Sequence, residues 1–248
     1  LIRLMIYSLK KNKRHNSWFS TKSTYRNKVF KHLDAKKGSI VSNLNKLSST
    51  NFDKLSNIIL KECEDHSLYE YTLINIFNIA IIQHTYCSNY VKLATLLVEK
   101  QSELKILIEN KTVEFKTINE SSMSKNNSNL SYDEFCDNNK LKLTKIGYSK
   151  FIGELYLKNL IQYDALKANL LFIIDNLNNY FNTESIDLQI IEDSIICLDT
   201  LLRTIASKLN LSELTCSKTH LETFIKNTKL TKRLKFKLMD LKDYLITI

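Results

Sequence analysis

The residues best suited to chemistry in this 248-residue chain are cations gathered at its two ends. Residues 1–38 hold eleven Lys or Arg and one acid, residues 218–248 hold eight and three, and residues 39–217 carry an acidic excess. Basic segments attract phosphates, and aromatic side chains among them can stack on exposed bases. The N-terminal segment therefore predicts RNA contact through Lys10, Lys11, Lys13, Arg14, Trp18, Lys22 and Arg26. For the C-terminal cluster, contact with phosphates and a merely solvated helix face are equally good interpretations.

Side chains that could catalyse a reaction or hold a metal ion are scattered. No glycine-rich phosphate loop, HExxH or GxSxG motif occurs, and the chain has three glycines in all. His84 and Cys87 form one closely spaced pair, whereas a closed zinc site needs four ligands. Adjacent acids such as Glu192 and Asp193 are more typical of a solvated helix face than of an acid/base dyad. We therefore expect no enzyme activity, no metal and no cofactor.

Cysteine spacing and hydropathy indicate the compartment. The five cysteines include no CxxC pair, so a reducing environment is the simplest interpretation. The longest apolar runs, at 76–82 and 170–174, are far shorter than the roughly 18–20 residues of a membrane span. We expect a soluble, cytoplasmic protein without a membrane partner.

The elements that position these residues are predicted to be helices. The chain has no proline, and apolar residues recur at helical spacing from residue 39 onward. After three helices between residues 40 and 82, the pattern predicts further helices near 89–100, 102–116, 148–159, 163–180, 187–208, 218–228 and 231–245. A polar loop near 119–131, followed by a weak helix near 131–137, separates two helical halves. Short helices joined by short turns favour an all-α stack of antiparallel pairs.

Three segments carry a family resemblance, and KFIGELY within the second is the most specific run. They are SIVSNLNKLSSTNFDKLSNIIL at 39–60, continued by LINIFNIAIIQHTYCSNYVKLATLL at 73–97; IGYSKFIGELYLKNLI at 146–161; and TKRLKFKLMDLKDYL at 231–245. In order and spacing they resemble the middle domain of the translation initiation scaffold factor 4G. The resemblance implies a HEAT-like helical-repeat solenoid of about five antiparallel helix pairs over residues 39–248, preceded by a basic, partly disordered lead-in at 1–38.

The resemblance also implies a function and a set of contacts. Middle domains of this family bind and stimulate a DEAD-box RNA helicase of the initiation-factor-4A type, contact RNA and can join further initiation factors. Carried over by position, the helicase-binding residues are Arg233, Lys235 and Phe236 in the last repeat, with Leu47, Phe52 and Tyr90 in the first repeats. The latter three could act by holding the fold alone. The alternative is an RNA-binding adaptor of the mRNA decay or nuclear cap-binding type, without a role in initiation.

Helical spacing also offers a structural interpretation of the same segments. It favours the hydrophobic core over a contact surface for Leu44, Leu47, Phe52, Leu55, Phe77, Phe151, Leu155, Phe236 and Leu238. A glycine inside a helix costs about 1 kcal/mol relative to alanine. Gly153 therefore predicts that another helix packs closely at its position.

Overall fold

The computed structural model describes residues 19–63, 66–120, 131–183 and 188–248, and no strand occurs among them. The α-helices are α1 (Phe19–Leu44), α2 (Phe52–Glu62), α3 (His66–Ile82), α4 (Cys87–Lys100), α5 (Leu104–Glu120), α6 (Tyr132–Leu157), α7 (Tyr163–Asn182), α8 (Leu188–Ile205), α9 (Leu211–Ile225) and α10 (Lys232–Thr247). Two short 3-10 helices, η1 (His84–Tyr86) and η3 (Ala206–Lys208), follow α3 and α8. The predicted all-α class is confirmed.

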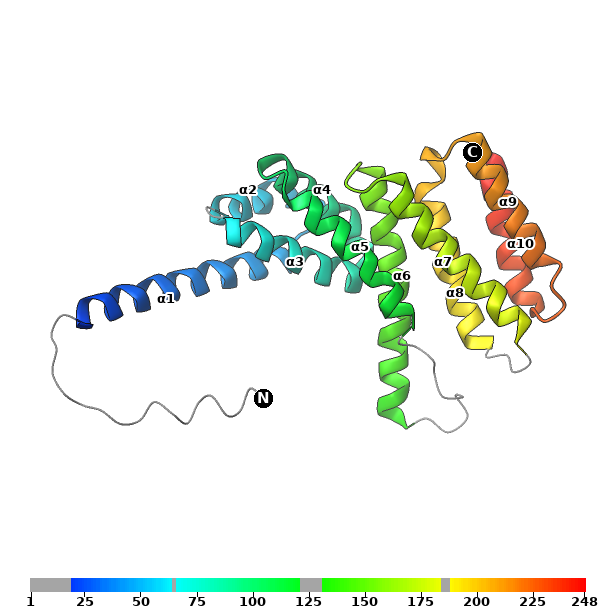
Figure 1. Cartoon of the computed structure of the whole chain (residues 1–248), viewed down its shortest axis with the longest axis horizontal. Coiled ribbons are helices and arrows are strands. Elements are labelled where there is room, and N and C mark those ends of the chain that lie inside the picture. The colour runs from blue at the N-terminus through cyan, green and yellow to red at the C-terminus, as the bar shows by residue number, and fades with distance from the viewer. Residues whose placement is uncertain (1–18, 64–65, 121–130, 184–187) are drawn as a thin grey trace.

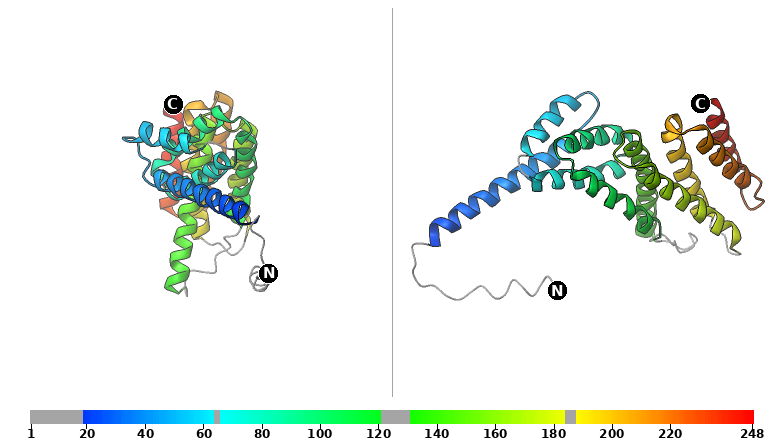
Figure 2. Two further views of the ribbon diagram at one scale, coloured as in Figure 1. Left: turned by 90° about the vertical axis from the view of Figure 1, so that its left-hand side faces the viewer. Right: turned by 45° about the horizontal axis from the view of Figure 1, so that its top comes forward.

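The helices pack in two rows. Odd-numbered helices contact one another in the order α1, α3, α5, α7, and even-numbered helices do so in the order α2, α4, α6, α8, α10. Consecutive helices also pack across the rows, as in α1 with α2, α3 with α4, α5 with α6, α7 with α8 and α9 with α10. In Figures 1 and 2 the helices follow one another in chain order along the long axis, from α1 at one end to α10 at the other.

A continuous apolar core lies between the rows. Phe77 of α3 and Phe151 of α6 meet edge to face, with ring centroids 4.7 Å apart. All but one of the residues predicted for the core are buried, and the exception is Phe236, which is 62% exposed. Its neighbours Leu234 and Leu238 occupy the buried face of α10, so Phe236, two residues from each, lies toward the opposite face.

Two glycines permit close helix packing along α6. A Cβ atom on Gly153 would lie 2.7 Å from the side chain of Thr204 in α8, which confirms the predicted close approach. A Cβ atom on Gly147 would lie 1.8 Å from the carbonyl oxygen of Ile81, at the end of α3. The second contact is with backbone, which cannot rotate away as a side chain can. Gly147 thus sets the separation of α3 and α6.

The helices differ from the predicted ranges in three places. Helix α1 begins at Phe19, so residues 19–38 of the predicted lead-in are helical and a boundary at residue 39 falls inside α1. Helix α6 replaces the separate helices expected near 131–137 and 148–159 and runs unbroken from Tyr132. Helix α9 begins at Leu211 instead of 218. Of the predicted loop at 119–131, residues 119 and 120 belong to α5 and residues 121–130 lie outside the described residues.

A capping box marks the start of α6, where the weak helix near 131–137 was predicted. Ser131 accepts a hydrogen bond from the backbone N–H of Glu134, and the Glu134 carboxylate accepts one from the backbone N–H of Ser131 at 2.9 Å. Such a cap satisfies amide groups that a helix N-terminus otherwise leaves unpaired. The polar first half of α6 extends beyond the neighbouring helices (Figures 1 and 2), with Tyr132 and Phe135 exposed on it.

A surface histidine joins α3 to the turn before α5. The Nε2 atom of His66 lies 2.9 Å from the Glu103 carboxylate, and Nδ1 lies 3.6 Å from that of Glu70. The hydrogen bond to Glu103, with the negative charges of Glu70 and Glu103, raises the pKa of His66 above its ordinary value of 6.5. The stabilisation from this contact is therefore complete below that ordinary value and is lost as pH rises through the raised pKa.

We expect His66→Gln to lower the free energy of unfolding more at about pH 5.5 than at about pH 8.5. The reason is that only the protonated imidazole attracts the two carboxylates. Chemical denaturation of both proteins at the two pH values measures the difference. In a Glu70→Gln/Glu103→Gln background, His66→Gln should have the same effect at both pH values. Equal effects in the wild-type background would contradict the prediction.

Candidate partner-binding surfaces

The exposed face of α10 is the first candidate, because it combines cations with apolar side chains. Phe236, Met239 and Ile246 are 62%, 42% and 56% exposed. Lys232 and Lys235 lie in the same helix, one turn or less before Phe236. An aromatic side chain surrounded by cations can anchor an interface while the cations select acidic groups on the partner. We call Lys232, Lys235, Phe236, Met239 and Ile246 the α10 surface.

Arg233 lies beside this surface but has a partner in its own chain. Its guanidinium donates a hydrogen bond to the Glu192 carboxylate of α8. Further along the same two helices, Lys237 lies 3.6 Å from Asp199, and Arg203 lies over the ring of Tyr244 at 4.6 Å. These contacts run in the same order along both helices, so α8 and α10 are parallel. Arg233 therefore helps to fix α10 on α8, which was not evident from the sequence.

We expect Arg233→Gln to lower the free energy of unfolding by about 0.5 kcal/mol more than Lys232→Gln, since its exposed ion pair is worth at most about 1 kcal/mol. Both changes remove one cation from the first turn of α10, so they have similar effects on the helix dipole. Denaturation at low and at high salt measures the difference, which should shrink as salt screens the pair. Indistinguishable variants at low salt would contradict a stabilising role for the contact with Glu192.

A groove lies between α9 and α10, next to the α10 surface. It has a volume of about 380 Å³ and is lined by Glu222, Ile225, Lys226, Met239, Lys242 and Asp243. Lys242 lies 2.9 Å from Glu222, and this hydrogen bond lowers the pKa of the Glu222 carboxyl. Met239 belongs to both the groove and the α10 surface, so a partner anchored on Phe236 can extend into the groove.

The predicted N-terminal contacts lie in the core instead of on a surface. Leu47, Phe52 and Tyr90 are 3%, 4% and 0% exposed. The Tyr90 hydroxyl donates to Leu44 O at 3.2 Å or to Gln83 Oε1 at 2.8 Å, and burial raises the pKa of Tyr90 to about 12. In this conformation each of these three side chains is covered by its own helices, so their part in helicase binding stays a prediction. Substitutions at these residues would change partner binding by altering the fold.

Most predicted RNA-binding residues lie outside the described residues. Lys10, Lys11, Lys13, Arg14 and Trp18 precede α1. Lys22 and Arg26 fall one turn apart in the first part of α1. Their contact with RNA stays a prediction.

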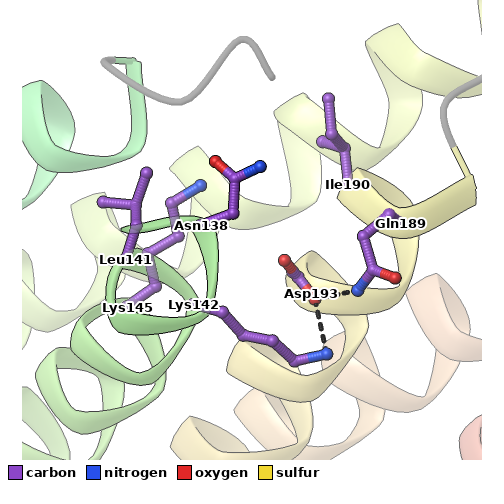
Figure 3. Close-up of a pocket in the computed structure, with 7 residues that line it drawn as sticks. All are labelled: Asn138, Leu141, Lys142, Lys145, Gln189, Ile190 and Asp193. Carbon is purple, nitrogen blue, oxygen red and sulfur yellow. Dashed lines mark hydrogen bonds and ion pairs between the residues drawn. The ribbon is translucent and has the colours of Figure 1, made fainter. Parts of the chain in front are cut away.

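A small pocket between α6 and α8 holds Lys145, the most deeply buried lysine among the described residues. Figure 3 shows Lys142 bridged to Asp193, at 2.9 Å, and Gln189 donating to the same carboxylate at 2.8 Å. Lys145 is 8% exposed, and burial lowers its pKa, opposed by the nearby Cys197 and Asp193. The pocket measures about 40 Å³, far below the roughly 300 Å³ of small-molecule sites. The arrangement joins two helices and leaves no room for a substrate.

Comparison with known proteins leaves the chain without an assigned family. No protein-family model and no curated protein matches it. In the part of the chain that the structure describes, no three His, Cys, Asp or Glu side chains are grouped as metal ligands would be. Within the same ranges, every helix is too short or too polar to cross a membrane.

Proposed function

We propose that this chain is a scaffold module of the initiation-factor-4G type, which binds a DEAD-box RNA helicase and speeds its RNA-dependent ATPase cycle. One observation carries the proposal. Phe236 is 62% exposed between buried leucines of α10, although its hydrophobic character alone predicts burial. The family resemblance places a helicase contact at this residue and at Lys235, which shares the surface. An exposed aromatic anchor beside a cation is the kind of group that dominates interface energies.

We also propose that the helices form a HEAT-like solenoid of about five antiparallel helix pairs, an architecture that is consistent with this function. The support is the packing pattern. Helices pair across two rows, and contacts within a row follow chain order, from α2 to α10 in the even-numbered row and from α1 to α7 in the odd-numbered row. In a solenoid each repeat contacts its neighbours, so the two ends present separate surfaces on one rigid frame. Helices α2 and α4 lie toward one end and α10 lies at the other (Figure 1).

A helical stack with two distant ends suits a partner with two lobes. A clamp that contacts both lobes favours whichever arrangement of the lobes it binds better. A tenfold shift between arrangements requires about 1.4 kcal/mol of differential affinity, which a single interfacial aromatic can supply. The chain would thereby change the helicase cycle without hydrolysing ATP itself.

RNA contact through the basic N-terminal segment is the second part of the proposal. The support is the charge of residues 1–38, with eleven Lys or Arg and one acid. The affinity for single-stranded RNA should fall as the salt concentration rises. In a plot of log affinity against log salt concentration, each phosphate neutralised should contribute roughly −0.7 to the slope. Changing Lys10, Lys11, Lys13 and Arg14 to serine should lower both the affinity and the slope. An unchanged slope would place the RNA site elsewhere.

Direct binding to the helicase tests the proposal. The full chain is titrated into a fluorescently labelled helicase of the initiation-factor-4A type, with and without ATP analogue and RNA. Saturable binding that depends on the nucleotide state supports the clamp. A folded chain that binds RNA but not the helicase would instead favour the RNA adaptor of the mRNA decay or nuclear cap-binding type.

A further inference from the structure

The first half of α6 carries large apolar side chains that lie open to solvent. Tyr132, Phe135 and Leu143 are 79%, 56% and 50% exposed. Phe135, Cys136, Asn139 and Leu143 follow Tyr132 by three, four, seven and eleven positions. At this spacing all five residues share one face of a helix. We call them the α6 stripe, because exposed apolar side chains on one helix face are typical of a surface that packs on another helix.

The α6 stripe lies on a different side of the helix from the contact with α8. The residues of α6 that line the pocket shared with α8 are Asn138, Leu141, Lys142 and Lys145, and none of them belongs to the stripe (Figure 3). Figures 1 and 2 show the first half of α6 extending beyond the neighbouring helices. The stripe is therefore accessible to a second molecule.

Two copies of the α6 stripe complement each other when their helices are antiparallel. A two-fold axis makes the contacts reciprocal, so that a pair formed in one direction is formed again in the other. When Tyr132 of one copy lies opposite Leu143 of a second copy, Cys136 lies opposite Asn139 in the same register. This register covers Tyr132 and Leu143 of both copies at once.

The charges beside the stripe favour the same register. Asp133, Asp137 and Lys140 are exposed and lie on one flank of the stripe. Because a two-fold axis brings the same flank of each helix together, Lys140 of one copy lies level with the interval between Asp133 and Asp137 of the other. Within one chain, Lys140 Nζ lies 3.4 Å from the Asp137 carboxylate. In the pair each lysine gains carboxylates of the second copy, so the apolar and the charged residues select one alignment.

We propose that two copies of this chain form a dimer through their α6 stripes, packed antiparallel. Each copy contributes about three turns of one helix, which is less than a standard interface of roughly 800 Å² per partner. The dimer is therefore weak and reversible. Neither the α10 surface nor residues 1–38 take part, so the dimer is independent of the helicase and RNA contacts proposed above.

The molar mass of the full chain in solution tests the proposal. Sedimentation equilibrium from about 1 µM to about 500 µM should show the average mass rising from 29.0 kDa toward twice that value. Reducing conditions exclude disulfide formation through the exposed cysteine. A chain that stays monomeric over the whole range would overturn the proposal and would leave the stripe to a different protein.

Substitutions in the stripe test its part in the dimer. Tyr132→Ser/Leu143→Ser should weaken the dimer at least about tenfold, and because both residues are exposed the chain should stay folded. The control Ile82→Ser/Leu211→Ser removes apolar residues of α3 and α9 that are 71% and 79% exposed, and it should dimerise as the wild type does. Equal weakening by the two variants would indicate non-specific association and would contradict the proposal.

Exchanged charges test the antiparallel register. Lys140→Asp and Asp133→Lys/Asp137→Lys each place like charges on the facing flanks, so at low salt each variant alone should dimerise about tenfold more weakly than the wild type. An equimolar mixture of the two should associate about tenfold more tightly than either alone, because opposite charges meet again in the mixed dimer. A mixture that associates no better than its components would overturn the proposed pairing.

Cysteine cross-linking locates the contact between the two copies. In the proposed register Cys136 lies three positions from its counterpart in the second copy, whereas the exposed Cys216 lies on α9, outside the stripe. A short bismaleimide should join wild-type chains into covalent dimers, and Cys216→Ser should be joined equally well. Cys136→Ser should stay monomeric on a denaturing gel. Covalent dimers that depend on Cys216 instead of Cys136 would place the contact elsewhere and overturn the proposal.

Discussion

Replacing Gly147 by alanine is expected to lower the free energy of unfolding by at least about 2 kcal/mol, at the upper end of typical overpacking effects. The added methyl group would lie 1.8 Å from the carbonyl oxygen of Ile81, so α3 and α6 must move apart. Such a shift loosens the contact of Phe77 with Phe151 as well. Alanine's better helix propensity offsets only about 1 kcal/mol of the loss.

Gly38→Ala is the matched control for this prediction. Gly38 also lies inside a helix, but a Cβ atom there would meet nothing within 4 Å. The change should therefore raise the free energy of unfolding by about 0.5–1 kcal/mol through helix propensity alone. Urea denaturation followed by circular dichroism measures both variants. If the two substitutions shift the stability in the same direction, the close packing of α6 on α3 is contradicted.

The double substitution Lys235→Glu/Phe236→Ala is expected to weaken binding to the helicase by at least about thirtyfold. Truncating one interfacial aromatic anchor typically costs about 2 kcal/mol or more of binding free energy. Reversing the charge of Lys235 adds repulsion from acidic groups on the partner. Arg233 is left unchanged, because its contact with Glu192 supports the packing of α10 on α8. A variant at Arg233 would confuse loss of packing with loss of binding.

The control for the α10 surface is Leu211→Ala/Lys218→Glu, which changes an exposed leucine and a lysine on α9. Leu211 is 79% exposed, so the control should stay folded and bind the helicase as the wild type does. Anisotropy titrations against the labelled helicase compare the three proteins, with circular dichroism spectra to show that all are folded. Equal affinities for the wild type and both variants would remove the α10 surface from the interface.

Much of the fold could be predicted from the sequence, because helical periodicity reports directly which side chains face a core. The residues of the first repeats that spacing predicts for the core are indeed buried: Leu44, Leu47, Phe52, Leu55 and Phe77. The same argument was wrong for Phe236. Periodicity assigns a face to a helix but does not tell whether an aromatic residue off that face is covered by another element.

Helix boundaries were predicted poorly where polar residues form a helix. The start of α6, which matches the helix predicted near 131–137, and the early start of α9 lie at capping boxes, formed by Ser131 with Glu134 and by Asn210 with Glu213. Both have the cap-x-x-Glu spacing, so this signal was available in the sequence. Once capped, a helix extends cooperatively through polar residues, which is why the low apolar content near 131–145 did not end α6.

The candidate surfaces depend on contacts between distant parts of the chain, which the sequence does not reveal. Arg233 and Glu192 are 41 residues apart, and their pairing follows from the parallel packing of α8 and α10.

The most direct test of the scaffold proposal is the RNA-dependent ATPase rate of an initiation-factor-4A-type helicase, measured with increasing amounts of the full chain. The proposal predicts a saturable rise in the rate, with no ATP hydrolysis by the chain alone and a much smaller rise with Lys235→Glu/Phe236→Ala. A folded chain that leaves the ATPase rate unchanged at every concentration, and that does not bind the helicase, would contradict it.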